Sequence, residues 1–386
     1  MVKRISKKIL ATAFSFMCIA NIALTAACNN PKTIVDYPEP STEVIRSTDT
    51  GGEVNDIPEE EEIDEAFLPE PDSLREEGKF KYNPSSLNST FKNQISNPKV
   101  IKAARKIMEN VYNVEETFVL EDEYEITEAE FNIAYQLATQ SSPMVDSVYI
   151  TREDDTNYKV VYFPKVDFDE RNQPIYGEGL TPEEAKAIFD EYETFVTDMI
   201  NDNLTSENTD MERAEIIYKA LIMNVDCTYS PTDTVEDSDD NVSEDSESPM
   251  LERVTKGELY IWELPYLYMY FLNQLHVDSM LVWCWGEYQP QNAELLDTEM
   301  GDEENCIWLI VTVDEKPYTC NIIFEKGVLD SQRLIVGDYD PDLQYFGMSD
   351  ETRDKSMKVF YINPSGTINP VKEPKVPNCP EDYKKQ

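Results

Sequence analysis

The spacing of apolar and polar positions changes several times along the chain, and each spacing predicts an element. Apolar side chains recur at helical spacing over residues 98–111 and again over 127–138. Residues 145–151 and 158–168 instead alternate like two strands of an antiparallel pair. Together these elements predict a small α+β domain over residues 92–204. Its pattern contains no motif that points to chemistry.

Two further helices follow, and the first has an explicit start signal. Thr181-Pro182-Glu183-Glu184 offers an N-cap hydroxyl, a proline at the first helical position and a glutamate placed for a capping box, so we expect a helix to about Asn201. A second helix begins at about Asp210, carries MERAEIIYKALIMNV and ends near Asp226. Residues 231–250 are acidic and lack aromatics, which predicts a mobile insertion.

The first residues have the pattern of an export signal. A basic start precedes an apolar run from Ile9 to Ala20 and then small residues, which predicts a signal peptide over residues 1–27. Leu24 to Cys28 resembles the lipobox of bacterial lipoproteins, although the leucine stands one residue further from the cysteine than usual. This resemblance implies a lipid on Cys28 that anchors the protein outside the cytoplasmic membrane. An ordinary cleaved signal and a retained anchor are the alternatives.

The composition after the signal predicts a spacer and limits the partners. Residues 28–91 are rich in Pro, Glu, Asp, Ser and Thr, which is typical of a disordered acidic linker. The whole chain has a formal net charge of −44. Nucleic acid is therefore excluded as a partner, because phosphate binding needs clustered cations. The charge itself argues for solubility rather than for an activity.

The cysteines do not form a recognisable framework. Besides Cys18 and Cys28, the chain contains Cys227, Cys284, Cys306, Cys320 and Cys379. This number is odd and no CxxC spacing occurs, so neither a zinc site nor a set of stapling disulfides is predicted. One or two disulfides outside the cell remain open, with no pairing assigned.

One acidic stretch resembles part of a calcium loop but lacks two required residues. Asp237, Asp239 and Asn241 alternate as in an EF-hand. Val242 stands where that loop needs glycine, and Ser248 where it needs a bidentate glutamate. We therefore expect a solvated acidic loop, and neither a metal nor a cofactor.

From residue 205 onward the order of elements resembles a known family. The helix ERAEIIYKALIMNVDCTY is followed by KGELYIWELPYLYMYFLNQLHVDSMLVWCWG, by the apolar hairpin NCIWLIVTVDEKPYTCNIIF and by QYFGMSDE. This order resembles the transglutaminase-like fold of secreted bacterial proteins, which shares its core with papain-like cysteine proteases. The resemblance implies an α+β domain over residues 205–386, with helices packed on an antiparallel sheet and a Pro-rich C-terminal tail. The matching positions are Tyr229, Gly257, Gly286, Trp308, Asp314, Tyr318, Tyr345, Phe346, Ser349 and Asp350.

The catalytic positions of that family are replaced here. Its chemistry needs a thiolate, an imidazole and an orienting carboxylate. Aligned on the motifs, the nucleophile falls on Leu259 or Ile261, the histidine on Cys306 and the aspartate on Asn321. The single histidine of the chain, His276, stands where the family turns on glycine. We interpret it as a helix C-terminal residue that contacts free carbonyls.

The remaining cysteines leave a rival interpretation open. A rearranged site could combine Cys284 or Cys306 with His276, and it would make the protein an active cysteine-dependent hydrolase or transamidase on peptide or cell-wall substrates. Nothing in the spacing selects these residues, and small apolar cysteines in strands are typically buried. We therefore interpret Cys284 and Cys320 as inert core residues.

Aromatic residues are dense around the predicted central helix, where Pro265 marks the first turn. They predict either a buried core helix or a groove for carbohydrate or peptide. The candidate groove residues are Tyr260, Trp262, Trp308 and Tyr318.

These observations lead to one main hypothesis and two alternatives. The main hypothesis is a cell-surface lipoprotein whose transglutaminase-like domain has lost its catalytic triad and acts as a binding or scaffolding module. Its partner would be an extracellular protein, peptide or glycan. The alternatives are the active thiol enzyme and a structural partner in an envelope assembly.

Overall fold

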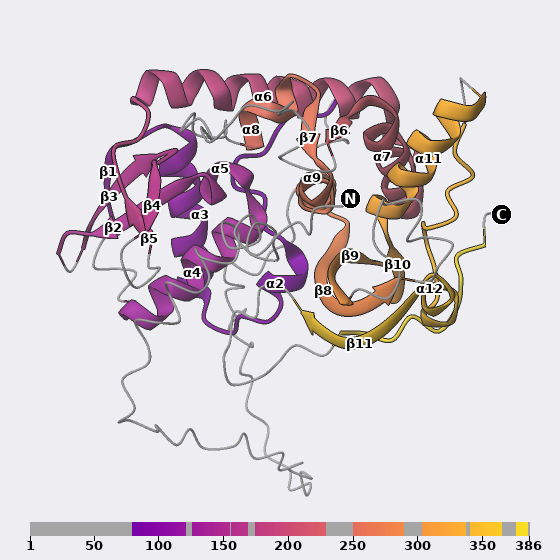
Figure 1. Ribbon diagram of the computed structural model, residues 1–386. Coiled ribbons are helices and arrows are strands. Elements are labelled where there is room, and N and C mark those ends of the chain that lie inside the picture. Colours follow the sequence, from indigo (N-terminus) through magenta and orange to yellow (C-terminus); the bar gives the residue numbers. More distant parts are fainter. Residues whose placement is uncertain are drawn as a thin grey trace, which may run out of the picture. The chain divides into compact units, whose positions relative to one another are not determined.

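The computed structural model has a mixed α+β fold with several small sheets (Figure 1). It describes residues 79–120, 126–154, 156–168, 174–228, 250–288, 303–336, 340–364 and 376–384. The described residues of 79–167 and 176–384 belong to one compact unit. The predicted signal peptide, Cys28 and residues 231–249 of the acidic insertion lie outside the described residues.

The predicted disordered linker ends earlier than residue 91. Phe80 and Leu87 are each only 2% exposed and Phe91 is fully buried, so residues 79–91 belong to the folded unit. The Asn88 side chain caps the short helix α2 (Ser89–Lys92) by accepting the N–H of Phe91 at 3.1 Å. The prediction was wrong here because it followed the Pro- and Ser-rich composition of this stretch and not its three apolar residues, Phe80, Leu87 and Phe91.

The next elements confirm the predicted helices and the predicted strand pair. Thr127 and Glu130 form a capping box at the start of α4, and Asn97 caps α3. Strands β2 and β3 pair antiparallel, with β1 on the far side of β3. The first strand begins later than predicted, because Val145 lies in a helix. The second predicted strand is divided into β3 and β4, which belong to different sheets, and Phe163 between them has a left-handed φ of 47°. The bounds are α3 Pro98–Tyr112, β1 Thr117–Val119, α4 Glu128–Ser141, α5 Pro143–Asp146, β2 Val148–Arg152, β3 Asn157–Tyr162, β4 Val166–Phe168 and β5 Pro174–Tyr176.

The two helices that follow begin as the sequence predicts. Helix α6 (Pro182–Asn203) has a complete capping box between Thr181 and Glu184, with proline in its first turn. Helix α7 (Asp210–Asn224) has a second capping box between Thr209 and Glu212. In both boxes the threonine hydroxyl accepts a backbone N–H and the glutamate accepts another, so two otherwise unpaired donors are satisfied.

A short parallel pair leads into the central helix. Strands β6 (Asp226–Thr228) and β7 (Glu258–Tyr260) pair in parallel, and α8 (Met250–Thr255) precedes β7. Gly257 adopts a φ of +75° between α8 and β7, a conformation that favours glycine. A 3₁₀ turn then opens α9 (Leu264–Gln274), in which all 11 residues are buried.

The apolar hairpin forms one side of a four-stranded antiparallel sheet. The sheet order is β10-β9-β8-β11, with β8 Asp278–Tyr288, β9 Glu303–Val313, β10 Lys316–Cys320 and β11 Met357–Pro364. Asp314 and Glu315 make the two-residue turn, with φ of 50° and 63°. Both residues are left-handed, as hairpin turns of the favoured twist require. The predicted hairpin is confirmed.

The second arm of the hairpin is shorter than predicted. Strand β10 ends at Cys320, and α11 (Ile322–Val336) begins directly after Asn321. Ile322 and Phe324 were expected to continue the alternation of the strand but are helical. The Asn321 side chain accepts the N–H of Phe324 at 3.3 Å, and this capping bond starts the helix.

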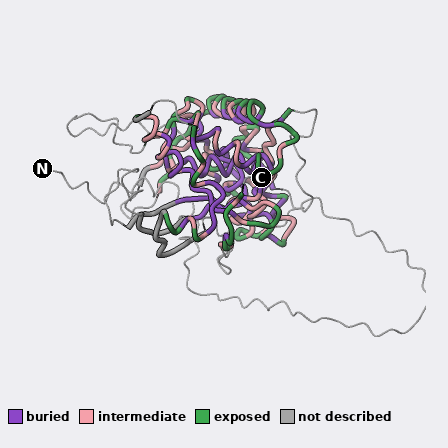
Figure 2. The backbone as a smooth tube through the Cα atoms, turned by 90° about the vertical axis from the view of Figure 1, so that its right-hand side faces the viewer, coloured by how far each residue is buried: buried purple, intermediate pink, exposed green. Residues whose placement is uncertain are grey.

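Helix α9 lies at the centre of the compact unit. It packs against α4, α7, α11, β8 and β9 (Figure 1). All of its residues are buried, and buried residues gather in the middle of the fold (Figure 2). Asn273 donates to the carbonyl of Gln140 at 3.1 Å and accepts from Asn88 at 2.9 Å. The predicted division at residue 204 therefore runs through a single compact unit.

Residues 376–384, here called the C-terminal strap, return to the sheet. Cys379 is 1% exposed and packs in a core cluster with Trp308, Val282 and Phe324. The N–H of Tyr383 donates to Gly347 at 2.7 Å. Gly347 has a φ of +69°, and a Cβ there would come within 2.7 Å of Tyr383. The predicted Pro-rich tail thus contributes to the core.

Candidate functional site

The residues that replace the family triad occupy structural positions. Leu259 is 1% exposed on β7, where it pairs with Cys227 of β6. Ile261 is 7% exposed in the 3₁₀ turn before α9. Asn321 is the helix cap described above, and its N–H also donates to the carbonyl of Tyr345 at 2.8 Å. Each side chain is accounted for by packing or capping.

Three of the cysteines have side chains poorly suited to nucleophilic attack. Burial raises the pKa of Cys227 to about 12 and that of Cys320 to about 12. Burial also raises the pKa of Cys379. A thiol attacks only as the thiolate, so at neutral pH these groups are protonated and unreactive. Cys284 and Cys306 occupy directly opposed positions on β8 and β9.

His276 forms part of the end of α9. Its φ is +57°, its N–H donates to Asn273 at 3.3 Å, and the N–H of Val277 donates to Leu272 at 3.0 Å. This pair of bonds is a Schellman motif with histidine at the position that usually carries glycine. His276 precedes β8, and Cys284 lies about 20 Å of extended strand beyond the first residue of β8. The register thus places Cys284 beside Cys306. His276 lies beyond the opposite end of β8.

The four candidate groove residues do not form one groove, because two are half-buried before α9 and two are buried in the sheet. Tyr260 and Trp262 are half-buried and stack with their rings 4.7 Å apart. The Arg253 guanidinium lies 4.4 Å from the Tyr260 ring centre. Trp308 is fully buried in the core cluster, with Arg353 over its ring at 5.1 Å. Tyr318 is 8% exposed and contacts Tyr383 of the C-terminal strap edge to face.

A groove on α6 provides a different surface, which sequence reasoning missed. It encloses about 750 Å³ between α6, the end of α7 and the end of α8. Four of its side chains are carboxylates, two are apolar and none is cationic. The lining residues are Asp190, Glu191, Thr194, Phe195, Asp198, Met199, Asp202, Asn203, Asn224 and Thr255.

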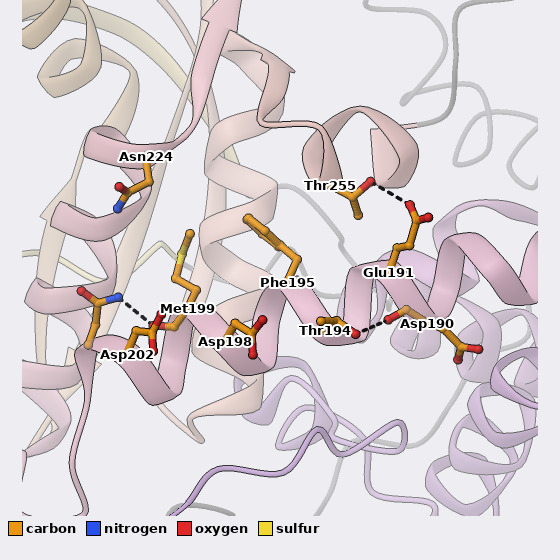
Figure 3. A pocket seen from close by; sticks show the side chains of 10 residues that line it. Asp190, Glu191, Thr194, Phe195, Asp198, Met199, Asp202, Asn224 and Thr255 are labelled. Carbon is orange, nitrogen blue, oxygen red and sulfur yellow. Dashed lines mark hydrogen bonds between the residues drawn. The ribbon is translucent and has the colours of Figure 1, made fainter.

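The side chains divide the groove into a floor and a rim (Figure 3). Phe195 and Met199 project from α6 between the neighbouring elements and form an apolar floor. The Phe195 ring contacts Phe271 of α9 edge to face at 5.9 Å, which ties the floor to the central helix. At one end Thr255 of α8 donates to Glu191 at 3.4 Å, and at the other Asn224 projects from α7.

The carboxylates of the rim differ in their partners. Asp190 pairs with Lys186 one helical turn earlier. Asp198 and Asp202 have no ion-pair or hydrogen-bond partner among the residues that the structure describes. They lie four residues apart on the same face, and like charges at that spacing destabilise a helix. They also lie near the C-terminal end of α6, where the helix dipole disfavours negative charge.

These two unfavourable placements define the chemistry of the groove. A bound cation would relieve both the repulsion between Asp198 and Asp202 and their conflict with the helix dipole. The signal was present in the sequence, since Asp190, Asp198 and Asp202 recur at multiples of four within the predicted helix. It was not singled out because a charged helix face is usually only a solvated face.

Metal ligation and membrane spanning have no candidate in the described part of the chain. It contains no cluster of three or more His, Cys, Asp or Glu side chains arranged to hold a metal ion. None of its helices combines the length and the apolar character that crossing a bilayer requires. No protein-family model matches the sequence, and no curated protein matches it.

Proposed function

We propose that this protein is a non-catalytic binding module that takes a cationic peptide segment in the α6 groove. In this proposal the domain keeps a transglutaminase-like core, with α9 as its central helix, and the catalytic residues have been replaced. The core then serves to hold α6, α7 and α8 in place around the groove. The partner is an extracellular protein or peptide that presents lysine or arginine side chains.

The single observation that carries the proposal is the composition of the groove. Asp198 and Asp202 face no cation among the described residues, and they stand beside an apolar floor of Phe195 and Met199. A lysine or arginine side chain matches both parts, because its alkyl stem covers apolar surface while its charged head remains at the rim. An aromatic floor adds attraction for a cation placed above the ring.

The proposed location follows from the N-terminal signal. A lipid on Cys28 would hold the protein outside the cytoplasmic membrane, and the acidic linker would keep the folded unit away from an anionic surface. A chain of net charge −44 attracts cationic segments. The ionic strength sets the distance over which this attraction acts.

Titration calorimetry with a short lysine-rich peptide tests the groove. We expect saturable binding that weakens with added salt, and little binding of a matched peptide with glutamine in place of lysine. Replacing Asp198 and Asp202 by Asn should weaken binding by about three- to tenfold, the range expected for two partly exposed ion pairs. Glu183→Gln is the matched control, because Glu183 is exposed on the same helix but outside the groove.

Two outcomes would contradict the proposal. Equal affinity for the lysine and glutamine peptides would remove the charge argument. Loss of affinity in Glu183→Gln equal to that in the Asp198/Asp202 variant would show attraction to the helix as a whole rather than to the groove.

Labelling with iodoacetamide tests the rival enzyme. We expect slow labelling of Cys227, Cys320 and Cys379 in the native protein, because burial raises their pKa values. We also expect His276→Gly to leave the labelling rates unchanged. Rapid labelling of one cysteine that is abolished by His276→Gly would favour the thiol hydrolase instead.

A further inference from the structure

The register of the two central strands of the sheet brings two cysteines together. Strands β8 and β9 pair antiparallel, and Cys284 stands directly opposite Cys306. The two residues are distant in sequence and meet only because the chain turns back between the strands. We propose that Cys284 and Cys306 form a disulfide that fastens the two central strands of the sheet.

The backbone spacing of opposed residues suits this bond. Directly opposed residues in antiparallel strands have Cα atoms about 4.5 Å apart in one kind of pair and about 5.5 Å in the other. Disulfides usually join Cα atoms about 4.4 to 6.8 Å apart. Both kinds of pair have a Cα spacing within this range, and the closer kind also brings the Cβ atoms nearest to the separation that the bond needs.

Buried neighbours fix the register on which the proposal depends. Met280 pairs with Ile310 and Val282 pairs with Trp308, and all four belong to one core cluster. The next pair in this row, two residues further along each strand, is Cys284 and Cys306. A slip by one residue would exchange the buried and the opposite face of a strand, so the core pairs hold the cysteines in register.

The other described cysteines offer each other no such partner. Cys227 stands opposite Leu259. Cys320 stands opposite Leu309, whereas its neighbour Thr319 stands opposite Ile310 and donates to the Cys379 sulfur at 3.5 Å. Adjacent residues of a strand lie on opposite faces, so Cys320 and Cys379 are on different sides of the sheet. All three remain free thiols.

The reaction requires an oxidant, which we take to be a small-molecule or protein disulfide. The thiolate of one cysteine attacks this disulfide, forms a mixed disulfide and releases one thiol. The second thiolate then attacks the mixed disulfide at the sulfur of the first cysteine and releases the other thiol. Two cysteine thiols thus lose two protons and two electrons, and the oxidant is reduced to two thiols.

The bond rests on the extracytoplasmic location in the proposed function, because disulfides persist in oxidising compartments. It does not rest on the α6 groove. The bond would hold β8 and β9 together near the end of β8 and the start of β9.

Peptide mass mapping of the full chain tests the bond. The protein is equilibrated with reduced and oxidised glutathione at defined ratios, its free thiols are blocked with iodoacetamide, and it is digested without reduction. We expect a linked pair of peptides that carries Cys284 and Cys306 when oxidised glutathione dominates, and at least a tenfold loss of this pair when reduced glutathione dominates. Circular dichroism checks that the protein is folded at each ratio.

Single variants identify the partners. Cys284→Ala should make Cys306 fully reactive toward iodoacetamide, and Cys306→Ala should do the same for Cys284. Cys227→Ala is the matched control and should leave the linked pair intact. The proposal is overturned if both cysteines stay alkylated at every glutathione ratio, or if either links to a different cysteine. Peptide binding measured on the same samples reports the groove separately.

Discussion

Glu325 is a buried carboxyl that makes the stability of the fold depend on pH. It is 1% exposed and accepts the N–H of Tyr345 at 2.7 Å. Burial raises its pKa from 4.5 to about 7, with a smaller contribution from Asp342, against the lowering effect of the N–H groups of Tyr345 and Gln344. Because the folded pKa exceeds the unfolded one, the folded protein binds the proton more tightly, and stability falls as the pH rises from 4.5 to 7.

We predict that Glu325→Gln removes this loss. Between pH 5 and pH 8 the parent should lose about 3 kcal/mol of unfolding free energy through this group, whereas the variant should not. Urea unfolding at both pH values measures the difference. Glu207→Gln, an exposed substitution, is the control and should leave the parent behaviour unchanged. A variant with the full pH dependence of the parent would contradict the assignment to Glu325.

His276 carries a backbone conformation that glycine adopts more easily. Its φ of +57° is left-handed, which costs a non-glycine residue about 1 to 2 kcal/mol. We predict that His276→Gly raises the unfolding free energy by about 1 kcal/mol in chemical denaturation. Ala187→Gly on the exposed face of α6 is the opposite control and should lower it by about 1 kcal/mol. A loss in His276→Gly would mean that the imidazole makes a contact worth more than the strain.

Sequence reasoning at the residue scale succeeded where one residue has one local role. It placed His276 at a helix end and Pro265 in the first turn of α9, and both are confirmed. It did not identify the cap formed by Asn321, because an asparagine after a strand pattern gives no sign that the next residues turn helical. It could not assign Trp308 to the core, since that depends on the strap that folds over it.

Helix α6 shows at the element scale how a binding surface can oppose the stability of its own element. Its first turn carries Glu183 and Glu184, where the dipole favours negative charge. Its last turns carry Asp198 and Asp202 and no basic residue in the final turn. The charges at the N-terminal end of α6 thus stabilise the helix. Those at its C-terminal end destabilise it, and they line the groove.

We predict opposite effects for charge removal at the two ends. The double variant Asp198→Asn and Asp202→Asn should raise the unfolding free energy by about 0.5 to 1 kcal/mol without ligand, because it removes two unfavourable charges. Glu183→Gln should lower it by a few tenths of a kcal/mol. Thermal unfolding at low ionic strength, without denaturant, measures both changes in unfolding free energy. Added salt should reduce both changes. Destabilisation by the double variant would mean that these carboxylates have favourable partners.

Element boundaries were predicted best where caps and turns are written in the sequence. The capping box of α6 and the apolar hairpin, which turns at Asp314 and Glu315, are both confirmed. The boundaries that failed depend on distant packing. Residues 79–91 are ordered by contacts such as that of Asn88 with Asn273, which lies far along the chain.

At the scale of the whole molecule, Asn273 joins parts that the sequence suggested were separate. Its amide donates to Gln140 at 3.1 Å and Ser141 at 3.3 Å, and it accepts from Asn88 at 2.9 Å. The backbone carbonyl of Asn273 accepts a hydrogen bond from the Ser86 hydroxyl at 2.8 Å. A single buried side chain therefore satisfies three separate polar groups from the N-terminal part of the compact unit.

We predict that Asn273→Leu destabilises the whole unit. The substitution keeps the volume similar but leaves these buried groups unpaired, which should cost about 2 to 4 kcal/mol in urea unfolding. Asn224→Leu is the matched control, because Asn224 is exposed and should change stability by no more than about 0.5 kcal/mol. A double variant with Asn88→Ala should be less destabilised than the sum of the singles. A fully additive result would contradict the bond between Asn88 and Asn273.

The C-terminal strap has a consequence for biogenesis. Cys379 fills a core cluster with residues of β8, β9 and α11, so that cluster is incomplete until synthesis has passed residue 384. A growing chain thus exposes the apolar face around Trp308 for as long as translation lasts.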